Sequence, residues 1–317
     1  MKRFLPVLGV AVGSLAISAL CVFIGPHFTL PGAGGLPANL LAMRLCRVAT
    51  AFAVGAALAS SGVVFQAVLR NPLADPYVLG VSAGAALGAA ATIVSGIAAA
   101  SPFALPAGAF LAAVVSLALV VALSSGRRAV SSEAGLILCG VIVSAMATSL
   151  LMVLQTFSSE KGLLSITWWM LGSLQSTPPR LLAIGTTASF AGFLAAWWMA
   201  RDLDVLTLGG EMAHHLGVKA RRTALLALAA GTLSAAAAVA MAGLIGFVGL
   251  IVPHAVRRIL GAGHRRLLPA CLFAGGAFLV LCDTFARAAF SPRELPVGVV
   301  TALLGGPFFL VLLRRRR

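Results

Sequence analysis

The stretch from Arg44 to Ala89 reads RLCRVATAFAVGAALASSGVVFQAVLRNPLADPYVLGVSAGAALGA. It contains an apolar block, Leu45–Leu69, and the start of a second one, Tyr77–Ala99, separated by the polar and proline-broken segment RNPLADP. About 20 mostly apolar residues are enough for a helix to cross the hydrocarbon core of a bilayer. The stretch therefore predicts two membrane-spanning helices joined by a short loop.

The same alternation extends along the whole 317-residue chain, which is 60% hydrophobic and only 10% charged, with a mean hydropathy of +1.05. Soluble domains carry about 25% charged residues. We predict an all-α polytopic membrane protein with about ten spans, forming a single domain over residues 1–317. The apolar blocks are Phe4–Ile24, Leu45–Leu69, Tyr77–Ala99, Phe103–Leu123, Ala134–Phe157, Leu181–Ala200, Thr223–Ala242, Ile245–Leu260, Leu267–Ala289 and Val297–Leu313.

The first block indicates a retained span rather than a cleaved signal peptide. Its apolar run is about 20 residues long, which exceeds the usual 7–15-residue signal core, and no A-x-A site follows it. With the N-terminus inside and ten crossings, seventeen of the 23 Lys and Arg residues fall on one side of the membrane. Because cytoplasmic loops are rich in Lys and Arg, both termini are predicted to be cytoplasmic. The pairs Trp168–Trp169 and Trp197–Trp198 bracket the sixth block, as interfacial anchors do.

The net charge of +15 does not indicate nucleic-acid binding, because the basic residues lie between apolar blocks and form no patch interleaved with aromatic residues. The five cysteines are scattered and show no CxxC spacing, which argues against a disulfide framework or a metal site. We interpret them as small apolar packing residues.

The motif GVSAG, with Ser82 at its centre, matches the G-x-S-x-G turn of serine hydrolases. That turn needs a preceding strand, and ten apolar blocks leave no sheet to supply one. Gly80, Gly84 and Gly88 instead form a small-residue ladder of the kind that lets a second helix approach closely. We interpret the motif as a packing ridge, and an intramembrane serine protease remains the third functional alternative.

Neither ATP hydrolysis by this chain nor ion coupling is favoured by the sequence. No G-x-x-x-x-G-K-[ST] loop is present, so any ATP hydrolysis must occur in a partner. Asp283 is the only acidic residue well inside a block, and Arg287 follows it at the helical spacing of an ion pair. An ion-coupled transporter, which usually has several such groups, is the second alternative.

Several passages, in order along nearly the whole chain, resemble the permease subunits of type II ABC importers (FecCD type), which import vitamin B12, ferric siderophores and haem. Beside Arg44–Ala89 they are LTLGGEMAHHLGV (Leu206–Val218), GLIGFVGLIVPHAVRRILGAGHRRLLP (Gly243–Pro269), DTFAR (Asp283–Arg287) and ELPVGVVTALLGGPFFLVLL (Glu294–Leu313). The resemblance implies a non-enzymatic subunit of ten helices in a bacterial cytoplasmic (inner) membrane. Its implied partners are a second permease copy, two cytosolic ABC ATPases that use ATP and Mg, and an extracytoplasmic substrate-binding protein. The chain itself would bind no cofactor or metal.

The resemblance also implies roles for individual residues. In the cytoplasmic loop at about 201–222, EMAHHLG matches the family's E-x-A-x-x-L-G element, which assigns ATPase coupling to Glu211, Ala213, Leu216 and Gly217. Docking of the binding protein falls to Arg44, Arg47 and Arg287, for which ordinary snorkelling at the interface is the alternative reading.

The cytoplasmic gate falls to two loops, with Asn71 and Leu73 in the first and Ser131 and Ser132 in the second. A helix N-cap at the two serines, with Glu133 as the acidic residue of the first turn, is compatible with that role. The sequence leaves the cargo open, because Tyr77 is the only tyrosine and no Tyr/His pair of haem-ligand type stands out.

Overall fold

The structure is a computed structural model that describes residues 4–25, 38–124, 133–175, 177–291 and 293–314. Within these ranges every regular element is a helix, so the predicted all-α class is confirmed. The elements are α1 Leu5–Phe23, α2 Ala38–Val68, η2 Pro76–Leu79, α3 Val81–Val94, η3 Ile97–Ala99, α4 Ala104–Ser124, α5 Glu133–Thr156, α6 Glu160–Met170, α7 Pro179–Trp198, α8 Ala200–Leu206, α9 Gly210–His215, α10 Ala220–Ala242, α11 Val248–Leu260, α12 His264–Ala288 and α13 Val297–Arg314.

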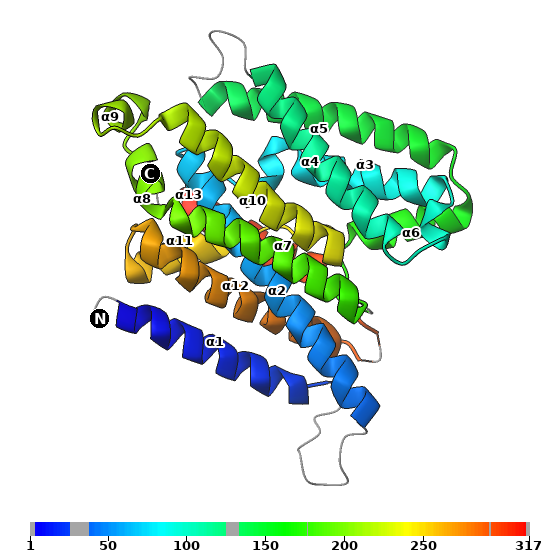
Figure 1. Ribbon diagram of the computed structural model, residues 1–317. Coiled ribbons are helices and arrows are strands. Elements are labelled where there is room, and N and C mark those ends of the chain that lie inside the picture. Colours follow the sequence, from blue (N-terminus) through cyan, green and yellow to red (C-terminus); the bar gives the residue numbers. More distant parts are fainter. Residues whose placement is uncertain (1–3, 26–37, 125–132, 176, 292, 315–317) are drawn as a thin grey trace.

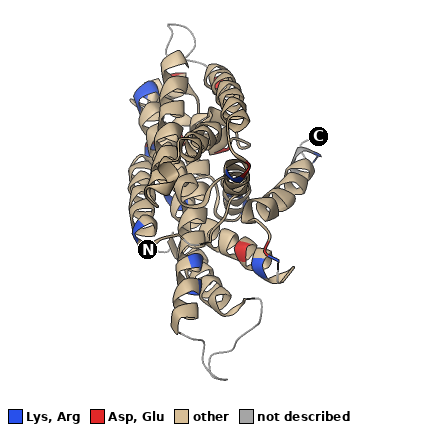
Figure 2. Cartoon of the chain, turned by 90° about the vertical axis from the view of Figure 1, so that its right-hand side faces the viewer, with Lys and Arg blue, Asp and Glu red and all other residues tan. Residues whose placement is uncertain are grey.

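Seven of these helices (α1, α2, α4, α5, α7, α10 and α12) are long and apolar enough to cross a membrane, and α3 and α13 contain shorter apolar segments. The long helices run side by side, so that the chain forms one bundle with two ends (Figure 1). The labels for both termini lie on the same side of the bundle as α8 and α9 (Figure 1). We call this the α9 end, and the side that carries α6 the α6 end. Figure 2 shows that charged residues form isolated spots on an otherwise uncharged bundle.

In two of the predicted blocks, the α-helix in the structure is shorter than the apolar run in the sequence. The block at 77–99 divides into η2, α3 and η3 because Gly80 and Gly96 adopt φ of +83° and +76°. The block at 245–260 becomes helical only from Val248, because its N-cap Phe247 has a φ of +68°. Left-handed residues interrupt the hydrogen-bond ladder of an α-helix, and apolar composition does not reveal them. The sequence also gave no prediction of α6, whose N-cap Ser159 accepts a hydrogen bond from the Gly162 amide.

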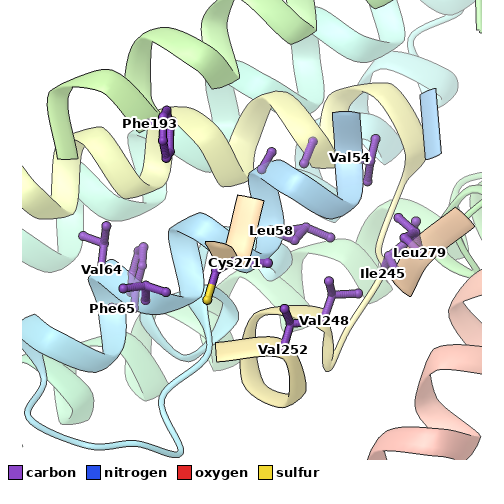
Figure 3. Packing of buried hydrophobic residues seen from close by; sticks show 14 of the residues in the cluster. Val54, Leu58, Val64, Phe65, Phe193, Ile245, Val248, Val252, Cys271 and Leu279 are labelled. Atoms are coloured by element: carbon purple, nitrogen blue, oxygen red, sulfur yellow. The ribbon is translucent and has the colours of Figure 1, made fainter. Parts of the chain in front are cut away.

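Helix α2 forms the centre of the bundle and packs against α12, α10, α11 and α7. Its glycines permit close backbone approach: a Cβ at Gly55 would collide with the Gly275 carbonyl of α12, and one at Gly62 with the Gly249 carbonyl of α11. Around these contacts, Leu58 of α2 lies near Val248 of α11 (Figure 3), and the buried ring of Phe65 packs against Gly231 of α10. Inside a bilayer, helix association expels no water, so membrane helices are held together largely by close packing of this kind.

The glycines of the GVSAG region face α4. A Cβ on Gly84 would meet Ser116 and the Ala112 carbonyl, and a Cβ on Gly88 would meet the Gly108 carbonyl. Gly80 is the N-cap of α3, and its carbonyl accepts a hydrogen bond of 2.8 Å from the Ser116 hydroxyl. Ser82 therefore lies in the first turn of a packed helix that follows η2, and not on a strand-to-helix turn.

Candidate functional site

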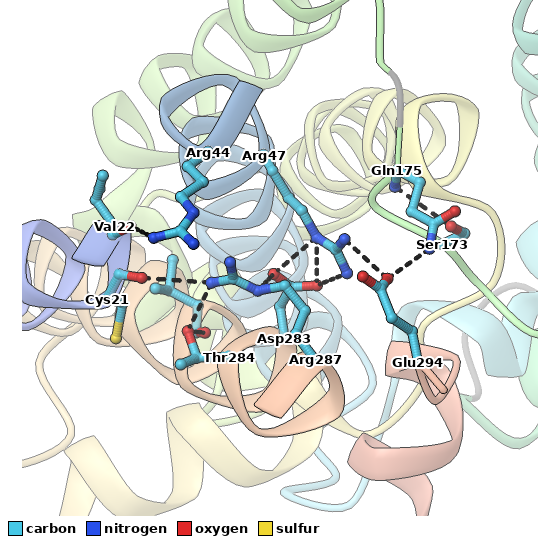
Figure 4. Close-up of polar contacts among 11 residues, drawn as sticks. Cys21, Val22, Arg44, Arg47, Ser173, Gln175, Asp283, Thr284, Arg287 and Glu294 are labelled. Carbon is cyan, nitrogen blue, oxygen red and sulfur yellow. Dashed lines mark hydrogen bonds and ion pairs between the residues drawn. The ribbon is translucent and has the colours of Figure 1, made fainter. Parts of the chain in front are cut away.

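Five charged residues meet at the α6 end, where α2 begins and α12 ends (Figure 4). We call Arg44, Arg47, Asp283, Arg287 and Glu294 the arginine cluster. Asp283 is its centre, because its carboxylate lies 2.9 Å from Nη2 of Arg47 and 3.2 Å from Nε of Arg287. The predicted ion pair between Asp283 and Arg287 is thus confirmed. The second partner, Arg47, comes from a helix 236 residues away in sequence, so spacing could not reveal it.

The other contacts of the cluster hold α1 and the α12–α13 connection. Nη1 of Arg44 donates to the carbonyls of Val22 and Phe23, and Nη2 of Arg287 donates to that of Cys21. The last carbonyls of a helix lack partners within the helix and carry partial negative charge, so arginines stabilise this end of α1. On the other side, Nη1 of Arg47 lies 2.9 Å from Glu294, which also accepts from Gln175.

The three arginines predicted to dock a binding protein therefore lie together, and each is engaged within the chain. The side chains of Asp283 and Arg287 are almost completely buried, whereas those of Arg47 and Glu294 are 17% and 31% exposed. Partial burial alone would raise the pKa of Glu294, but hydrogen bonding and attraction from Arg47 outweigh it and lower that pKa. Arg47 and Glu294 are thus the charged members of the cluster that solvent or a partner can reach.

At the α9 end, the segment RNPLADP turns the chain from α2 into η2. Arg70 has a φ of +44°, the Asn71 side chain accepts from the Leu73 amide at 3.0 Å, and the Asp75 side chain caps η2 by accepting from the Tyr77 amide. These side-chain bonds are typical of turns. The Tyr77 hydroxyl in turn donates to the Ile245 carbonyl at 3.0 Å. Asn71 and Leu73, the first pair of predicted gate residues, therefore lie in a turn with fixed geometry.

The second pair, Ser131 and Ser132, lies outside the described residues, but the next residue does not. Glu133 begins α5 and forms an ion pair with Arg70. Arg70 also lies beside the loop before α9, since a Cβ on Gly209 would come within 3.1 Å of Nη1 of Arg70. Arg70 therefore connects its own turn to two segments that are distant in sequence, the start of α5 and the loop before α9. The sequence predicted Glu133 only as part of a helix cap, because no local pattern reveals a partner 63 residues away.

The predicted coupling loop contains the two short helices α8 and α9. Helix α9 ends in a Schellman motif, in which the Val218 amide donates to the Ala213 carbonyl and the Gly217 amide to the His214 carbonyl. Gly217 has a φ of +80°, which explains the need for glycine at this position. Of the predicted coupling residues, Ala213 is buried, whereas Glu211 and Leu216 are exposed.

Apolar side chains in and directly beside α9 are also exposed. Leu208, Met212 and Leu216 are 63%, 51% and 56% exposed, in a segment that is otherwise polar. Grouped exposed apolar residues in a polar region are typical of a surface that a protein partner covers.

Helix α8 is fixed to α12 by one pair of side chains. Nδ1 of His264 lies 2.6 Å from Oδ1 of Asp204, and the backbone amide of His264 donates to the same oxygen at 2.9 Å. Partial burial would raise the pKa of Asp204, but the bonds from His264 and its charge outweigh that effect and lower the pKa. A cavity of about 310 Å³ beside this pair is lined by Gln66, Arg70, Pro72, Asp204, Arg257 and His264, among others. The turn after α2 and the segment before α9 thus share one cavity.

These features define a class: an integral membrane protein made of one helical bundle, with a polar cluster at one end and an exposed short helix at the other. Among the described residues, no group of three or more His, Cys, Asp or Glu side chains is placed to hold a metal ion. The chain belongs to the FecCD transport family, whose model matches residues 5–315. This match confirms the resemblance seen in the sequence.

Named relatives include the permease of a hemin transport system and that of a cobalamin import system. The hemin transport system permease protein HmuU of Yersinia pestis is 39% identical over 286 residues, which cover 87% of this chain and 83% of that protein. The cobalamin import system permease protein BtuC of Halobacterium salinarum is 42% identical over 277 residues, which cover 86% of this chain and 73% of that protein. A solved structure described as an inward-facing conformation of a metal-chelate type ABC transporter aligns with a TM-score of 0.86 at 33% identity and covers 98% of both chains.

Proposed function

We propose that this chain is the membrane-spanning subunit of an ATP-driven, binding-protein-dependent importer for a metal chelate. The cargo is a ferric siderophore, haem or cobalamin, in keeping with the cargoes named for its relatives. Two copies of the chain enclose one pathway across a bacterial cytoplasmic membrane. The pathway opens alternately to each side, and a pair of cytosolic ATPase subunits supplies the energy from ATP and Mg.

The exposed apolar surface of α9 is the observation that carries this proposal. A carrier that worked alone would gain nothing from placing Met212 and Leu216 on an exposed polar segment, because exposed apolar area is unfavourable in water. An ATPase that covered them would bury that area. Glu211 lies beside them in the first turn of α9 and adds a charged contact.

Arg70 offers a route from the ATPase to the gate. Displacement of the α8–α9 segment would move Gly209 against Arg70 and so disturb its ion pair with Glu133. The pair joins the turn that holds Asn71 and Leu73 to the start of α5, which follows Ser131 and Ser132 directly in sequence, and we expect the pair to break when the gate opens. The gate acts by steric closure, which suits a large chelate.

At the opposite end, the arginine cluster receives the substrate-binding protein. An acidic side chain of that protein would replace Glu294 beside Arg47, while Arg44 and Arg287 keep α1 and α12 in place. The cluster carries three positive and two negative charges, so its net charge favours an acidic partner.

The direct test is the ATPase activity of the reconstituted complex. With the partner ATPase and this chain in liposomes, loaded binding protein added to the side of the arginine cluster should raise ATP hydrolysis severalfold. The Leu216→Ser variant should weaken that response. If hydrolysis by the partner were the same with and without this chain, the two proteins would not be coupled and the proposal would be wrong.

A further inference from the structure

We propose that a cavity at the α9 end binds the phosphate head group of an anionic phospholipid. The cavity has a volume of about 340 Å³ and lies where α7, α8 and α12 meet. Its lining residues are Trp197, Trp198, Ala200, Arg201 and Arg265, and we call it the tryptophan–arginine cavity. It requires only that the chain spans a bilayer, and it is independent of what the chain transports.

The two tryptophans place the cavity at the depth of the lipid head groups. They occupy the last turn of α7, and Trp198 is 90% exposed. Tryptophan is enriched at the boundary between hydrocarbon and water, where its large ring is accommodated with its N–H group. Trp197 is held in position because its Nε1 donates a hydrogen bond of 3.1 Å to the Arg265 carbonyl on α12.

The two arginines supply positive charge without an internal counter-charge. Arg201 and Arg265 are both exposed, and neither takes part in an ion pair within the described ranges of the chain. Of the two carboxylates on α8, Asp204 is already engaged by His264. The other, Asp202, follows Arg201 directly in sequence. A guanidinium group presents parallel N–H donors that match two oxygens of a phosphate, so the cavity is complementary to a phosphate anion.

An exposed apolar stripe on α7 indicates that the phosphate belongs to a lipid and not to a soluble anion. Phe190, Leu194 and Trp198 follow one another at intervals of four residues and are therefore aligned on one face of the helix. Phe190 and Leu194 are 50% and 44% exposed. The stripe leads from the cavity toward the middle of α7, and an acyl chain can lie along it while the head group occupies the cavity.

Quenching of tryptophan fluorescence by brominated phospholipids tests this site in the full-length chain. Trp168→Phe and Trp169→Phe leave Trp197 and Trp198, at the cavity, as the remaining tryptophans. In bilayers that mix a brominated with an unbrominated lipid, the proposal predicts tighter binding of phosphatidylglycerol than of phosphatidylcholine. The expected preference is roughly fivefold to thirtyfold, because one basic residue near an anionic membrane contributes about 1 kcal/mol and the cavity has two. In the same background, Arg201→Gln with Arg265→Gln should reduce the preference to near one.

A second pair of substitutions separates a defined site from general attraction. Arg258 and Arg266 lie at the same end, are exposed, and line none of the cavities described above. Replacing both by Gln removes the same charge and should leave the preference intact. Replacing Arg201 and Arg265 by Lys retains the charge and should preserve most of the preference, which distinguishes loss of charge from misfolding. Equal loss in both Gln variants, or no preference in the parent chain, would overturn the proposal.

Discussion

Asp283 is the residue on which the arginine cluster depends. Its carboxylate is buried and pairs with both Arg47 of α2 and Arg287 of α12. Burial of two guanidinium groups without a carboxylate is costly, since removal of one partner from a buried ion pair typically destabilises a protein by about 3–5 kcal/mol. The cluster is therefore a structural joint between α2 and α12 as well as the proposed docking site.

We expect Asp283→Asn to lower the free energy of unfolding by about 3 kcal/mol, because the amide leaves the charges of Arg47 and Arg287 without their shared counter-ion. Unfolding by sodium dodecyl sulfate in mixed micelles measures this change. Asp202→Asn is a matched control, since Asp202 takes part in no ion pair within the described residues. An equal effect of both substitutions would contradict the structural role of Asp283.

Unlike the charge of Asp283, the charge of Asp75 is expected to lower the stability of the folded protein. Burial raises its pKa to about 6 from 3.8, although the hydrogen bond from the Tyr77 amide acts the other way. A raised pKa means that the neutral form is favoured in the folded state. The contribution of Asp75 to stability is therefore complete below pH ~4 and is lost as the pH rises through about 6.

We predict that Asp75→Asn stabilises the protein by about 1–2 kcal/mol at pH 7.5, because an amide can still cap η2 without a buried charge. Thermal unfolding in detergent at pH 7.5 and pH 5 measures the difference. The gain should shrink markedly at pH 5, where Asp75 itself is largely protonated. A gain that did not depend on pH would show that the charge of Asp75 is not its cause.

At the scale of elements, the α8–α9 segment is the part of the α9 end that we propose contacts the ATPase. The bonds from His264 to Asp204 hold α8 against α12, and the Schellman motif at Gly217 fixes the end of α9. With α9 held in this way, the exposed side chains of Met212 and Leu216 keep a defined orientation toward a partner.

Leu216→Ser should lower the affinity of the chain for the proposed ATPase partner about tenfold, because it removes apolar area that the partner would cover. Stability of the chain alone should change little, since Leu216 is exposed. Ile259→Ser is the control, since Ile259 is 78% exposed in the last turn of α11 and lies outside the α8–α9 segment. Binding measured by light scattering or by a labelled partner should separate the two variants, and equal affinities would argue against α9 as the contact.

Most of the elements could be predicted from the sequence, because apolar blocks separated by charge and proline report directly on burial in a membrane. Each predicted block contains a helix in the structure. Positive φ at Gly80, Gly96 and Phe247 shortens two of them, and such local conformations are poorly encoded in composition. Helix α6 was not predicted, since its first turn is polar and it contains only 11 residues.

The candidate sites could be predicted only in part. The i,i+4 spacing of Asp283 and Arg287 revealed one ion pair, because both residues lie on one helix. Contacts between distant segments, such as Arg70 with Glu133 and Asp204 with His264, depend on how the helices pack. No spacing rule reports on that packing.

At the scale of the whole molecule, the two ends of the bundle differ in chemistry. One end holds a cluster of paired charges around Asp283, and the other holds an exposed short helix beside the turn after α2. An ion-coupled carrier would need a carboxylate that is free to bind and release its ion, whereas Asp283 is held by two arginines. The arrangement favours a subunit that receives cargo at one end and energy from a partner at the other.

Uptake into proteoliposomes tests this account most directly. The chain would be reconstituted with its ATPase and its binding protein, and import of a labelled metal chelate would be followed with ATP, with a non-hydrolysable analogue, or with only an ion gradient. We expect the labelled chelate to accumulate with ATP, and not with the analogue or with the ion gradient. Accumulation driven by an ion gradient in the absence of the ATPase would contradict it.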